Sequence, residues 1–500
     1  MSPTDASSFA LCSCRCSISQ SILTNTAVAS LGRVINILAG LLVVAALTRV
    51  LHANGYGQYA ALVSFTTILQ IIADFGLYLT FTKAIGRSPD LTAPLLQKIT
   101  RLRLILLGGT FLLGAVLVPF VIQGPSNHWL AYVVLALGLT FQSLSQLRMG
   151  LFQAHGTLWR ATIGDLAGRG IQILSILLAA RYISSHPQSD PLTFMIAAFT
   201  AGTLTSLVIH QALTPKLQTA AALSESYSWG QIMKDSWPLA AILILNVIYF
   251  RVDMVMLAIL RPQVEVGWYG LAYRLIESVL FFPAMLGGIL LPRLSKAGSQ
   301  GQSRLLKQSL SLASIGGMGL GLIFFLYPAA ITTLISGPDY APAGPLLRIL
   351  SFTIPIMFVG NIIGFGLVAA HKQKAMLYLS IGLVLGNSLG NILLIPRLGP
   401  TGAAITTLLT EIASMTIAAG ILHGIHPVMP SRTQLTRTLG IAVITILVAL
   451  TLRSTPVPAL IKVGLTSLSY LAACYLTGAL NKAGFSELLR QKNPIARPAL

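Results

Sequence analysis

Long apolar segments follow one another from about residue 20 to about residue 480, and short polar segments separate them. Each apolar segment has close to the ~20 residues that an α-helix needs to cross the hydrocarbon core of a bilayer. The alternating segments that build a transmembrane β-barrel are absent. The sequence therefore predicts an all-α polytopic membrane protein. We place about 14 transmembrane helices at residues 20–48, 56–82, 102–122, 128–148, 159–181, 192–213, 236–260, 266–291, 308–327, 346–369, 375–395, 400–422, 437–453 and 458–480.

Two short motifs occur twice, at nearly the same offset along the chain. The segment 150–155 (GLFQAH) returns as 366–371 (GLVAAH), and the Gly-x-Tyr motif at 57–59 returns at 267–269. Six predicted spans lie between the copies, and because six is an even number both copies have the same orientation in the membrane. The sequence therefore predicts two parallel repeats of six helices, related by an axis along the membrane normal.

The longest polar stretch between two predicted spans is the expected linker between these repeats. Two lobes that face each other enclose a central cavity, the arrangement by which alternating-access transporters move their cargo. The predicted domains are a cytoplasmic N-terminal tail (1–19), an N-lobe (20–213), an inter-lobe linker (214–235), a C-lobe (236–422), a two-helix C-terminal appendix (423–480) and a cytoplasmic tail (481–500).

Composition agrees with a membrane protein, and the distribution of charge predicts its orientation. Of the 500 residues, 54% are hydrophobic and only 9% are charged, whereas soluble proteins carry about 25% charged residues. With the N-terminus inside, the predicted inner loops and tails hold 22 lysines and arginines, and the outer loops hold six. Cytoplasmic loops carry this excess in membrane proteins, so both termini are predicted to be cytoplasmic. The same bias accounts for the net charge of +20 without a nucleic-acid partner.

Residues 89–103 fit two interpretations. Leu91, Leu95, Ile99 and Leu102 recur at helical spacing, with basic residues off this stripe. The segment is either a short amphipathic helix on the inner leaflet, drawn there by anionic lipid, or an extension of the third predicted span.

The sequence carries no enzymatic or cofactor motif. It contains no Walker loop, so the chain does not hydrolyse ATP itself. Cys12, Cys14 and Cys16 form a Cys-x-Cys-x-Cys run in the predicted cytoplasmic tail, where thiols stay reduced. A metal site would need a fourth ligand and a folded scaffold. We therefore predict no metal site, no cofactor and no enzymatic activity.

Arg33 lies near the middle of the first predicted span. An ionisable residue inside a span costs ~2.5–3.5 kcal/mol on insertion scales, so it requires a partner, water or a function. Small and polar residues, among them Asn36, share its helical face. This stripe predicts a wet cavity or an anionic ligand. The alternative is that Arg33 pairs with an acid of another helix, Asp74 or Asp165.

The seventh and eighth predicted spans carry a denser group of charges. Arg251 and Asp253 lie in the seventh span, and Arg274 and Glu277 lie at similar depth in the eighth. Adjacent antiparallel helices would bring these residues to one level. They either form a charge-balanced network that locks the helices, or an acid among them takes up a cation or proton as cargo moves. Asp253 is the first ion-coupling candidate and Glu277 the second.

Three further charged residues lie inside predicted spans. Asp165 and Arg169 are four residues apart in the fifth span, a spacing that predicts an intrahelical ion pair with a structural role. Glu411 lies in the middle of the twelfth span, with no basic residue near it in the sequence. It is either a third ion-coupling candidate or a donor or acceptor in helix packing.

Several loose motifs occur in a characteristic order between residues 20 and 420. They are 49–59 (RVLHANGYGQY), 74–77 (DFGL), 249–257 (YFRVDMVML), 266–274 (VGWYGLAYR), 337–340 (GPDY), Asn387, Asn391, 394–396 (LIP) and 399–404 (GPTGAA). In order and spacing the chain resembles the polysaccharide-transport family of the multidrug/oligosaccharidyl-lipid/polysaccharide exporter superfamily.

The resemblance implies a flippase of the bacterial or archaeal cytoplasmic membrane. Its cargo is undecaprenyl-diphosphate-linked oligosaccharide, moved outward for O-antigen, capsule or exopolysaccharide synthesis. It implies two lobes around a cationic cavity, in which Arg33, Asn36, Arg251 and Arg274 are candidate substrate contacts, because guanidinium groups bind phosphate oxygens in a bidentate fork. Coupling to H⁺ or Na⁺ is implied for some members. A glycan polymerase or chain-length regulator is a further expected partner.

Two other functions stay open. One is an ion-coupled multidrug or small-solute antiporter of the same superfamily, which would be expected to have twelve spans and an acidic cavity. The other is a non-transporting scaffold of a polymer-synthesis complex, in which the buried charges would be paired throughout. The two extra spans and the cavity arginines favour the flippase.

Overall fold

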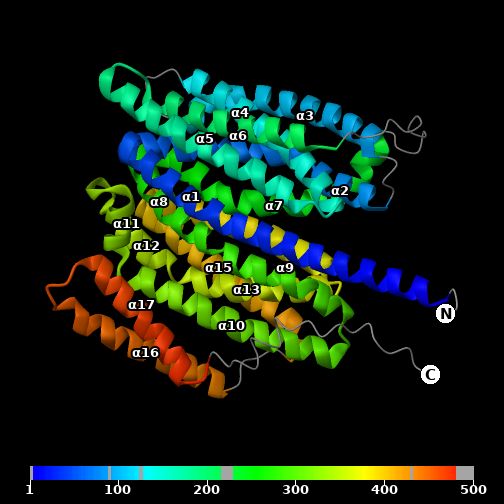
Figure 1. The fold of residues 1–500 in the computed structure, drawn as a ribbon. Helices are drawn as coiled ribbons and strands as arrows, with labels where there is room; N and C mark the ends of the chain where they lie inside the picture. Colours follow the sequence, from blue (N-terminus) through cyan, green and yellow to red (C-terminus); the bar gives the residue numbers. More distant parts are fainter. Residues whose placement is uncertain (1–3, 88–91, 123–127, 216–228, 428–431, 480–500) are drawn as a thin grey trace. The chain divides into compact units, whose positions relative to one another are not determined.

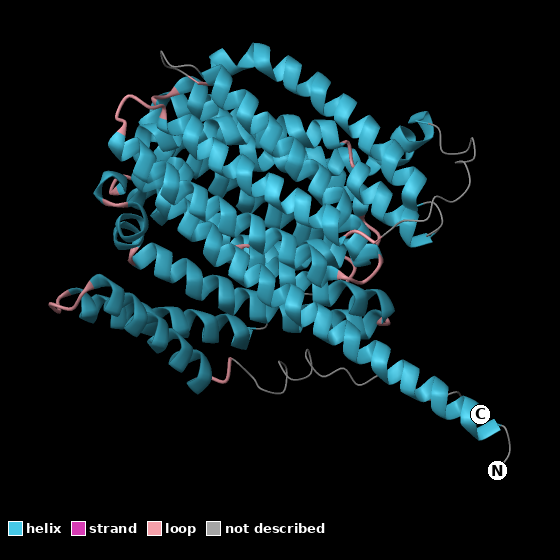
Figure 2. Cartoon of the chain, turned by 45° about the horizontal axis from the view of Figure 1, so that its top comes forward, coloured by secondary structure: helices cyan, strands magenta, loops and turns pink. Residues whose placement is uncertain are grey.

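A computed structural model describes residues 4–87, 92–122, 128–215, 229–427 and 432–479, with side chains from Leu31 onward except at positions 238, 239, 432 and 435. Within these ranges the regular elements are α-helices, together with one 3-10 turn at Pro338–Tyr340 (Figure 2). The prediction of an all-α protein is therefore confirmed. The cysteine side chains of the predicted N-terminal tail, residues 216–228 of the predicted linker and the predicted C-terminal tail lie outside the described residues.

In the described part of the chain, thirteen helices are long and apolar enough to cross a membrane. Twelve of them correspond to the third through fourteenth predicted spans. The first two predicted spans differ, because α1 (Thr4–Asp74) covers most of both. At His52 the backbone leaves the helical conformation (φ 53°, ψ −178°), so α1 consists of two helices joined at a kink. The loop predicted between these spans is therefore a kink within one helical run.

The chain divides into two compact units, Met1–Gly267 and Trp268–Leu500. The first unit contains α1, α2 (Leu77–Arg87), α3 (Thr92–Val121), α4 (His128–Ala154), α5 (Leu158–Ser185), α6 (Pro191–Leu213) and α7 (Trp229–Leu260), coloured blue to green in Figure 1. α8 (Gln263–Val279) begins in the last residues of the first unit and continues into the second. The predicted division into an N-lobe and a C-lobe at the linker stays a prediction.

Glycines let the helices of the first unit approach closely. α5 packs against α6, α4 against α6, and α1 against α5. A Cβ atom on Gly168 would lie 2.5 Å from the Gly202 carbonyl oxygen, and one on Gly202 would lie 2.8 Å from the Gly168 carbonyl oxygen. Likewise, a Cβ on Gly32 would lie 2.0 Å from the Thr162 methyl carbon. Close backbone approach through small residues is a common basis of helix association in membranes, and here it draws α1, α5 and α6 together.

The two glycines of the repeated Gly-x-Tyr motif lie at one tight contact. A Cβ on Gly57 would be 1.8 Å from the Gln263 carbonyl oxygen, and a Cβ on Gly267 would be 2.0 Å from the Ala53 carbonyl oxygen. Both positions therefore require glycine for close backbone packing. This contact gives the sequence repeat a structural reason.

The third predicted span is longer than expected, because α3 runs without a break from Thr92 to Val121. This supports the interpretation of the segment before residue 103 as an extension of that span. Its apolar stripe is buried, with Leu95 1% and Ile99 0% exposed. The stripe therefore packs against the protein interior.

The second unit contains the remaining helices. They are α9 (Phe281–Lys296), α10 (Ser299–Leu326), α11 (Pro328–Ser336), α12 (Ala343–Leu350), α13 (Thr353–Ala369), α14 (Gln373–Leu398), α15 (Pro400–His423), α16 (Arg432–Arg453) and α17 (Ala459–Leu476). α10 packs against α13, α14 against α15, and α16 against α17. The Tyr470 hydroxyl of α17 donates a buried hydrogen bond of 2.5 Å to the Ile315 carbonyl of α10. This bond fastens the last helix to the rest of the unit.

Candidate functional site

A polar cavity of about 260 Å³ lies inside the first unit, between α1, α4, α5 and α6. Most of its lining side chains are amides, hydroxyls or ionisable groups: Asn36, Gln142, Ser145, Gln146, Asp165, Arg169, Gln172, Thr203, Ser206 and His210. Met149 and Phe199 add apolar surface. Polar groups inside an apolar membrane unit are costly and mark functional sites, so this cavity is the candidate site.

Three residues selected from the sequence, Asn36, Asp165 and Arg169, line this cavity. Arg33 lies one turn before Asn36 on α1, is exposed, and acts electrostatically on Asp165. Of the polar stripe predicted for the first span, Asn36 lines the polar cavity. The part of the prediction that concerns a bound anion stays a prediction.

Arg169 joins α1 and α5 at the cavity wall. Its Nε donates to Asn36 Oδ1 at 3.0 Å, and its Nη1 donates to Gln172 Oε1 at 2.7 Å. Because a guanidinium group can only donate, both amide side chains must turn their carbonyl oxygens toward it. The geometry therefore fixes the orientation of two amides that line the cavity.

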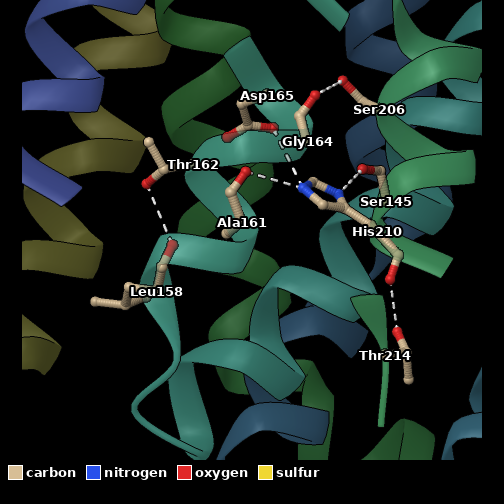
Figure 3. A network of polar contacts seen from close by, with 9 residues as sticks. All are labelled: Ser145, Leu158, Ala161, Thr162, Gly164, Asp165, Ser206, His210 and Thr214. Atoms are coloured by element: carbon tan, nitrogen blue, oxygen red, sulfur yellow. Dashed lines mark hydrogen bonds and ion pairs between the residues drawn. The ribbon is translucent and has the colours of Figure 1, made fainter. Parts of the chain in front are cut away.

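His210 on α6 is the centre of a buried polar network that the sequence analysis did not select (Figure 3). Its ring is 1% exposed, with Nδ1 2.6 Å from Ser145 Oγ and Nε2 2.9 Å from the Ala161 carbonyl oxygen. The same Nε2 is 3.9 Å from Asp165 Oδ1. A histidine inside an apolar span is a signal that sequence reasoning could have used. The network ties α4, α5 and α6 together at the cavity.

Behind the cavity wall, Arg103 of α3 forms a buried ion pair with Asp74 of α1. The side chains are 0% and 6% exposed, and Arg103 Nη2 also donates to Gln146 Oε1 at 3.2 Å. Arg103 is one of the 22 basic residues that the sequence predicts for the inner loops and tails, whereas in the structure it lies inside α3, which begins at Thr92. Asp74, considered as a partner of Arg33, pairs with Arg103 instead.

Four other charged candidates lie on α7 and α8. In the first unit Asp253 on α7 is 2% exposed and accepts a hydrogen bond from the Met254 backbone N–H at 2.7 Å, and Arg251 is half-buried. In the second unit Arg274 donates to Glu277 Oε2 at 3.0 Å within α8. This pair has the shared helical face that the sequence predicts for residues three apart.

Glu411 lies in a buried polar group of the second unit. It is 8% exposed, one turn after Thr407, whose hydroxyl lies 3.3 Å from the Tyr269 hydroxyl. Nearby on α14 and α15, Asn391 Oδ1 and Thr406 Oγ1 are buried and have no hydrogen-bond partner among the described residues. The group is therefore rich in oxygen atoms that can accept.

Two family profiles match the sequence. The profile of the family described as "Polysaccharide biosynthesis protein" covers residues 22–298, more than half of the chain, and the MatE profile covers residues 238–393. An uncharacterized membrane protein, MJ1068 of Methanocaldococcus jannaschii, is 28% identical over an alignment of 140 residues that covers 26% of this chain. That match spans only 27% of the relative's length.

The fold is similar to two kinds of solved structure. The lipid II flippase MurJ in its inward closed conformation matches with a TM-score of 0.71 and 14% identity, over 92% of this chain and 99% of that one. An inward-facing multidrug resistance MATE family transporter of the MOP superfamily matches with a TM-score of 0.62 and 14% identity, over 77% and 95% of the two chains. At this identity the likeness shows a shared fold, which is the fold that the sequence resemblance predicts.

Proposed function

Because the chain belongs to the polysaccharide biosynthesis protein family, within the MOP superfamily of transporters, we propose that it is a lipid-linked oligosaccharide flippase. It moves undecaprenyl-diphosphate-linked oligosaccharide from the inner to the outer leaflet of a bacterial or archaeal cytoplasmic membrane. The product supplies a cell-surface polysaccharide such as O-antigen, capsule or exopolysaccharide. The chain is a multi-pass membrane transporter and not an enzyme.

The polar cavity of the first unit is the observation that carries this proposal. Its amide and hydroxyl side chains offer paired donors and acceptors, which is the chemistry that binds the hydroxyl groups of a sugar. Within the described lining of the cavity Asp165 is the one carboxylate. A glycan fits this lining better than a cationic drug, for which an acidic cavity is expected.

The diphosphate of the substrate would be held by arginine side chains. Arg33 is exposed on the polar stripe of α1 that includes Asn36. Arg251 and Arg274 are further proposed contacts, and the Arg274 side chain is 46% exposed. A guanidinium group binds two phosphate oxygens at once, so such contacts both neutralise and orient the head group.

A coupled ion would bind at a buried acid. Asp253 is 2% exposed and Glu411 is 8% exposed, so both carboxylates are buried. Either a proton or Na⁺ would neutralise such a carboxylate and satisfy neighbouring oxygens. Glu277 is the weaker candidate, because its pair with Arg274 already neutralises it.

Transport would proceed by alternating access between the proposed N-lobe (20–213) and C-lobe (236–422), with both termini in the cytoplasm. The two last helices, α16 and α17, are the proposed appendix to this core. A glycan polymerase or a chain-length regulator would act on the product in the outer leaflet. Single introduced cysteines, labelled from either side of the membrane, would test the orientation.

An ion-coupled multidrug antiporter is the second candidate, favoured by the MatE match over residues 238–393. The location of lipid-linked oligosaccharide in cells that lack this protein separates the two. A flippase predicts accumulation on the inner leaflet and loss of surface polymer. Unchanged lipid-linked intermediates together with altered drug tolerance would favour the antiporter, and unchanged leaflet distribution with lost polymer would indicate a scaffold.

Two substitutions test the diphosphate contacts in the same cells. Arg33→Ala and Arg274→Ala should each abolish polymer export while the protein still inserts normally, because each removes a fork-shaped phosphate donor. Arg397→Ala is the matched control, since Arg397 is an exposed arginine on α14 outside the polar cavity. Normal export from both test variants would contradict the proposed contacts.

A further inference from the structure

Four amides line the cavity, and the carbonyl oxygen of each accepts a hydrogen bond from another side chain of the first unit. Asn36 Oδ1 and Gln172 Oε1 accept from Arg169, and Gln146 Oε1 accepts from Arg103. Gln142 Oε1 accepts a longer bond, 3.4 Å, from Gln70, whose Nε2 also donates to the Leu139 carbonyl. These donors fix the orientation of the four amides.

An amide whose oxygen is held on one side presents its NH₂ group on the other. Three of the four oxygens face arginines, which have no acceptor atoms, so the amides cannot be reversed without losing these bonds. Since the four residues line the cavity, their amide nitrogens form a set of N–H donors around it. The cavity therefore selects for a ligand rich in acceptor oxygens.

Two hydroxyl groups of the lining, unlike the amides, offer a ligand acceptor oxygens rather than donors. Ser206 Oγ donates to the Gly164 carbonyl at 3.0 Å, and Thr203 Oγ1 donates to the Thr200 carbonyl at 2.9 Å. With their protons used inside the protein, these oxygens can only accept from a ligand. The Asp165 side chain, 38% exposed, is a further acceptor. A ligand must therefore bring hydroxyl donors as well as acceptor oxygens.

Charge and size narrow the ligand further. Arg169 in the lining and Arg33 beside it outweigh Asp165, so the site as a whole favours an anion. The Asp165 carboxylate opposes a group that carries several negative charges, such as a diphosphate. A volume of about 260 Å³ lies below the ~300–1,000 Å³ typical of sites for drug-sized ligands, so it suits a single ring.

We propose that this cavity is a subsite for one carboxylate-bearing sugar ring, of the hexuronic acid class, within the transported glycan. The amide N–H groups of Gln146 and Gln172 hold the sugar carboxylate, while Asp165 and the serine and threonine oxygens accept from the ring hydroxyls. The inference rests on the proposed function, because it names one sugar of the cargo.

Ligand binding to the purified full-length protein in detergent tests this inference by calorimetry, with glucuronate, glucose and inorganic pyrophosphate as probes. Glucuronate should bind at least tenfold more tightly than glucose. Gln172→Glu keeps the shape and the acceptor for Arg169 but replaces the N–H donors by a repelling oxygen. This variant should lose tenfold or more in glucuronate affinity with little change for glucose. Gln146→Glu should behave alike, since it keeps the bond from Arg103.

Gln231→Glu makes the same change at an exposed position of α7 outside the cavity and should leave all affinities unchanged. Equal affinity for glucose and glucuronate, no saturable glucuronate binding, or unaltered binding by Gln172→Glu would each overturn the inference. Pyrophosphate binding that is tighter than glucuronate binding and lost in Gln172→Glu would assign the cavity to the diphosphate instead. The cellular assay separates the two proposals: inner-leaflet accumulation without glucuronate preference overturns the subsite alone, and unchanged intermediates overturn the flippase.

Discussion

The buried Asp74–Arg103 pair allows a quantitative test of how the cavity wall is held. The Arg103 side chain is 0% exposed, and the ion pair with Asp74 and one bond to Gln146 Oε1 are the contacts that satisfy its charge. Two of its nitrogens, Nε and Nη1, are buried without a hydrogen-bond partner among the described residues. In Asp74→Asn the buried guanidinium group of Arg103 would have only neutral hydrogen-bond partners.

Breaking a buried ion pair by removing one partner typically costs about 3–5 kcal/mol, because the other charge stays buried and uncompensated. The near-complete burial of both side chains places this pair in that range rather than in the 0–1 kcal/mol range of exposed pairs. Replacing both residues by leucine removes the charge as well as its partner. The double variant should therefore recover most of the loss, less about 1–3 kcal/mol for the Gln146 oxygen that loses its donor.

Reversible unfolding in mixed micelles, with a rising proportion of denaturing detergent, measures these free energies. Asp74→Asn should be destabilised by about 3–5 kcal/mol, and Asp74→Leu/Arg103→Leu should be markedly more stable than Asp74→Asn. A loss below about 1 kcal/mol in Asp74→Asn would mean that the pair is solvated like an exposed one, and the reasoning from burial would be refuted. A double variant no more stable than the single one would refute the assignment of the cost to an uncompensated charge.

Two further substitutions test the packing of each unit. Gly57→Ala should destabilise the protein by at least about 1–3 kcal/mol, because its Cβ would overlap the Gln263 carbonyl. Gly108→Ala is the control in the same micelle assay and should be neutral or slightly stabilising, since open space surrounds Gly108. Tyr470→Phe should cost about 0.5–1.5 kcal/mol through loss of its buried bond to the Ile315 carbonyl, and unchanged thermal stability would contradict a role for this bond in fastening α17.

Span positions could be predicted from the sequence because hydrophobicity over some twenty residues is a local property. Each predicted span from residue 128 onward overlaps one observed helical span, although bounds differ by up to nine residues, as where the span predicted at 308–327 begins at Ser299. The sequence predicts a break between the first two spans because Arg49 ends one apolar segment and the Gly-x-Tyr motif at 57–59 opens the next. In the structure the chain is helical on both sides of a kink at His52, and beyond the kink Gly57 packs against the Gln263 backbone.

Buried charges were harder to place. Arg103 follows several basic residues in the sequence, so counting loop charges assigned it to the inner surface. Its burial depends on where α3 begins and on Asp74, which is far away along the chain. A count of basic residues along the sequence contains neither the start of α3 nor the position of Asp74 in the fold. The predicted orientation does not depend on Arg103 alone, because the excess of basic residues in the predicted inner loops comes from many residues.

The contacts within the candidate site also depend on helix packing, which the sequence alone does not show. Asn36 and Arg169 were selected for separate reasons, as a polar residue on a stripe and as half of an ion pair within a helix. Their hydrogen bond depends on the approach of α1 to α5, which Gly32 permits by leaving room for Thr162. The same bond turns the Asn36 amide nitrogen away from Arg169. The chemistry that the cavity offers a ligand is therefore set by the arginines that bind its amides, Arg169 in the lining and Arg103 behind the wall, and only the packed helices reveal which end of each amide a ligand would meet.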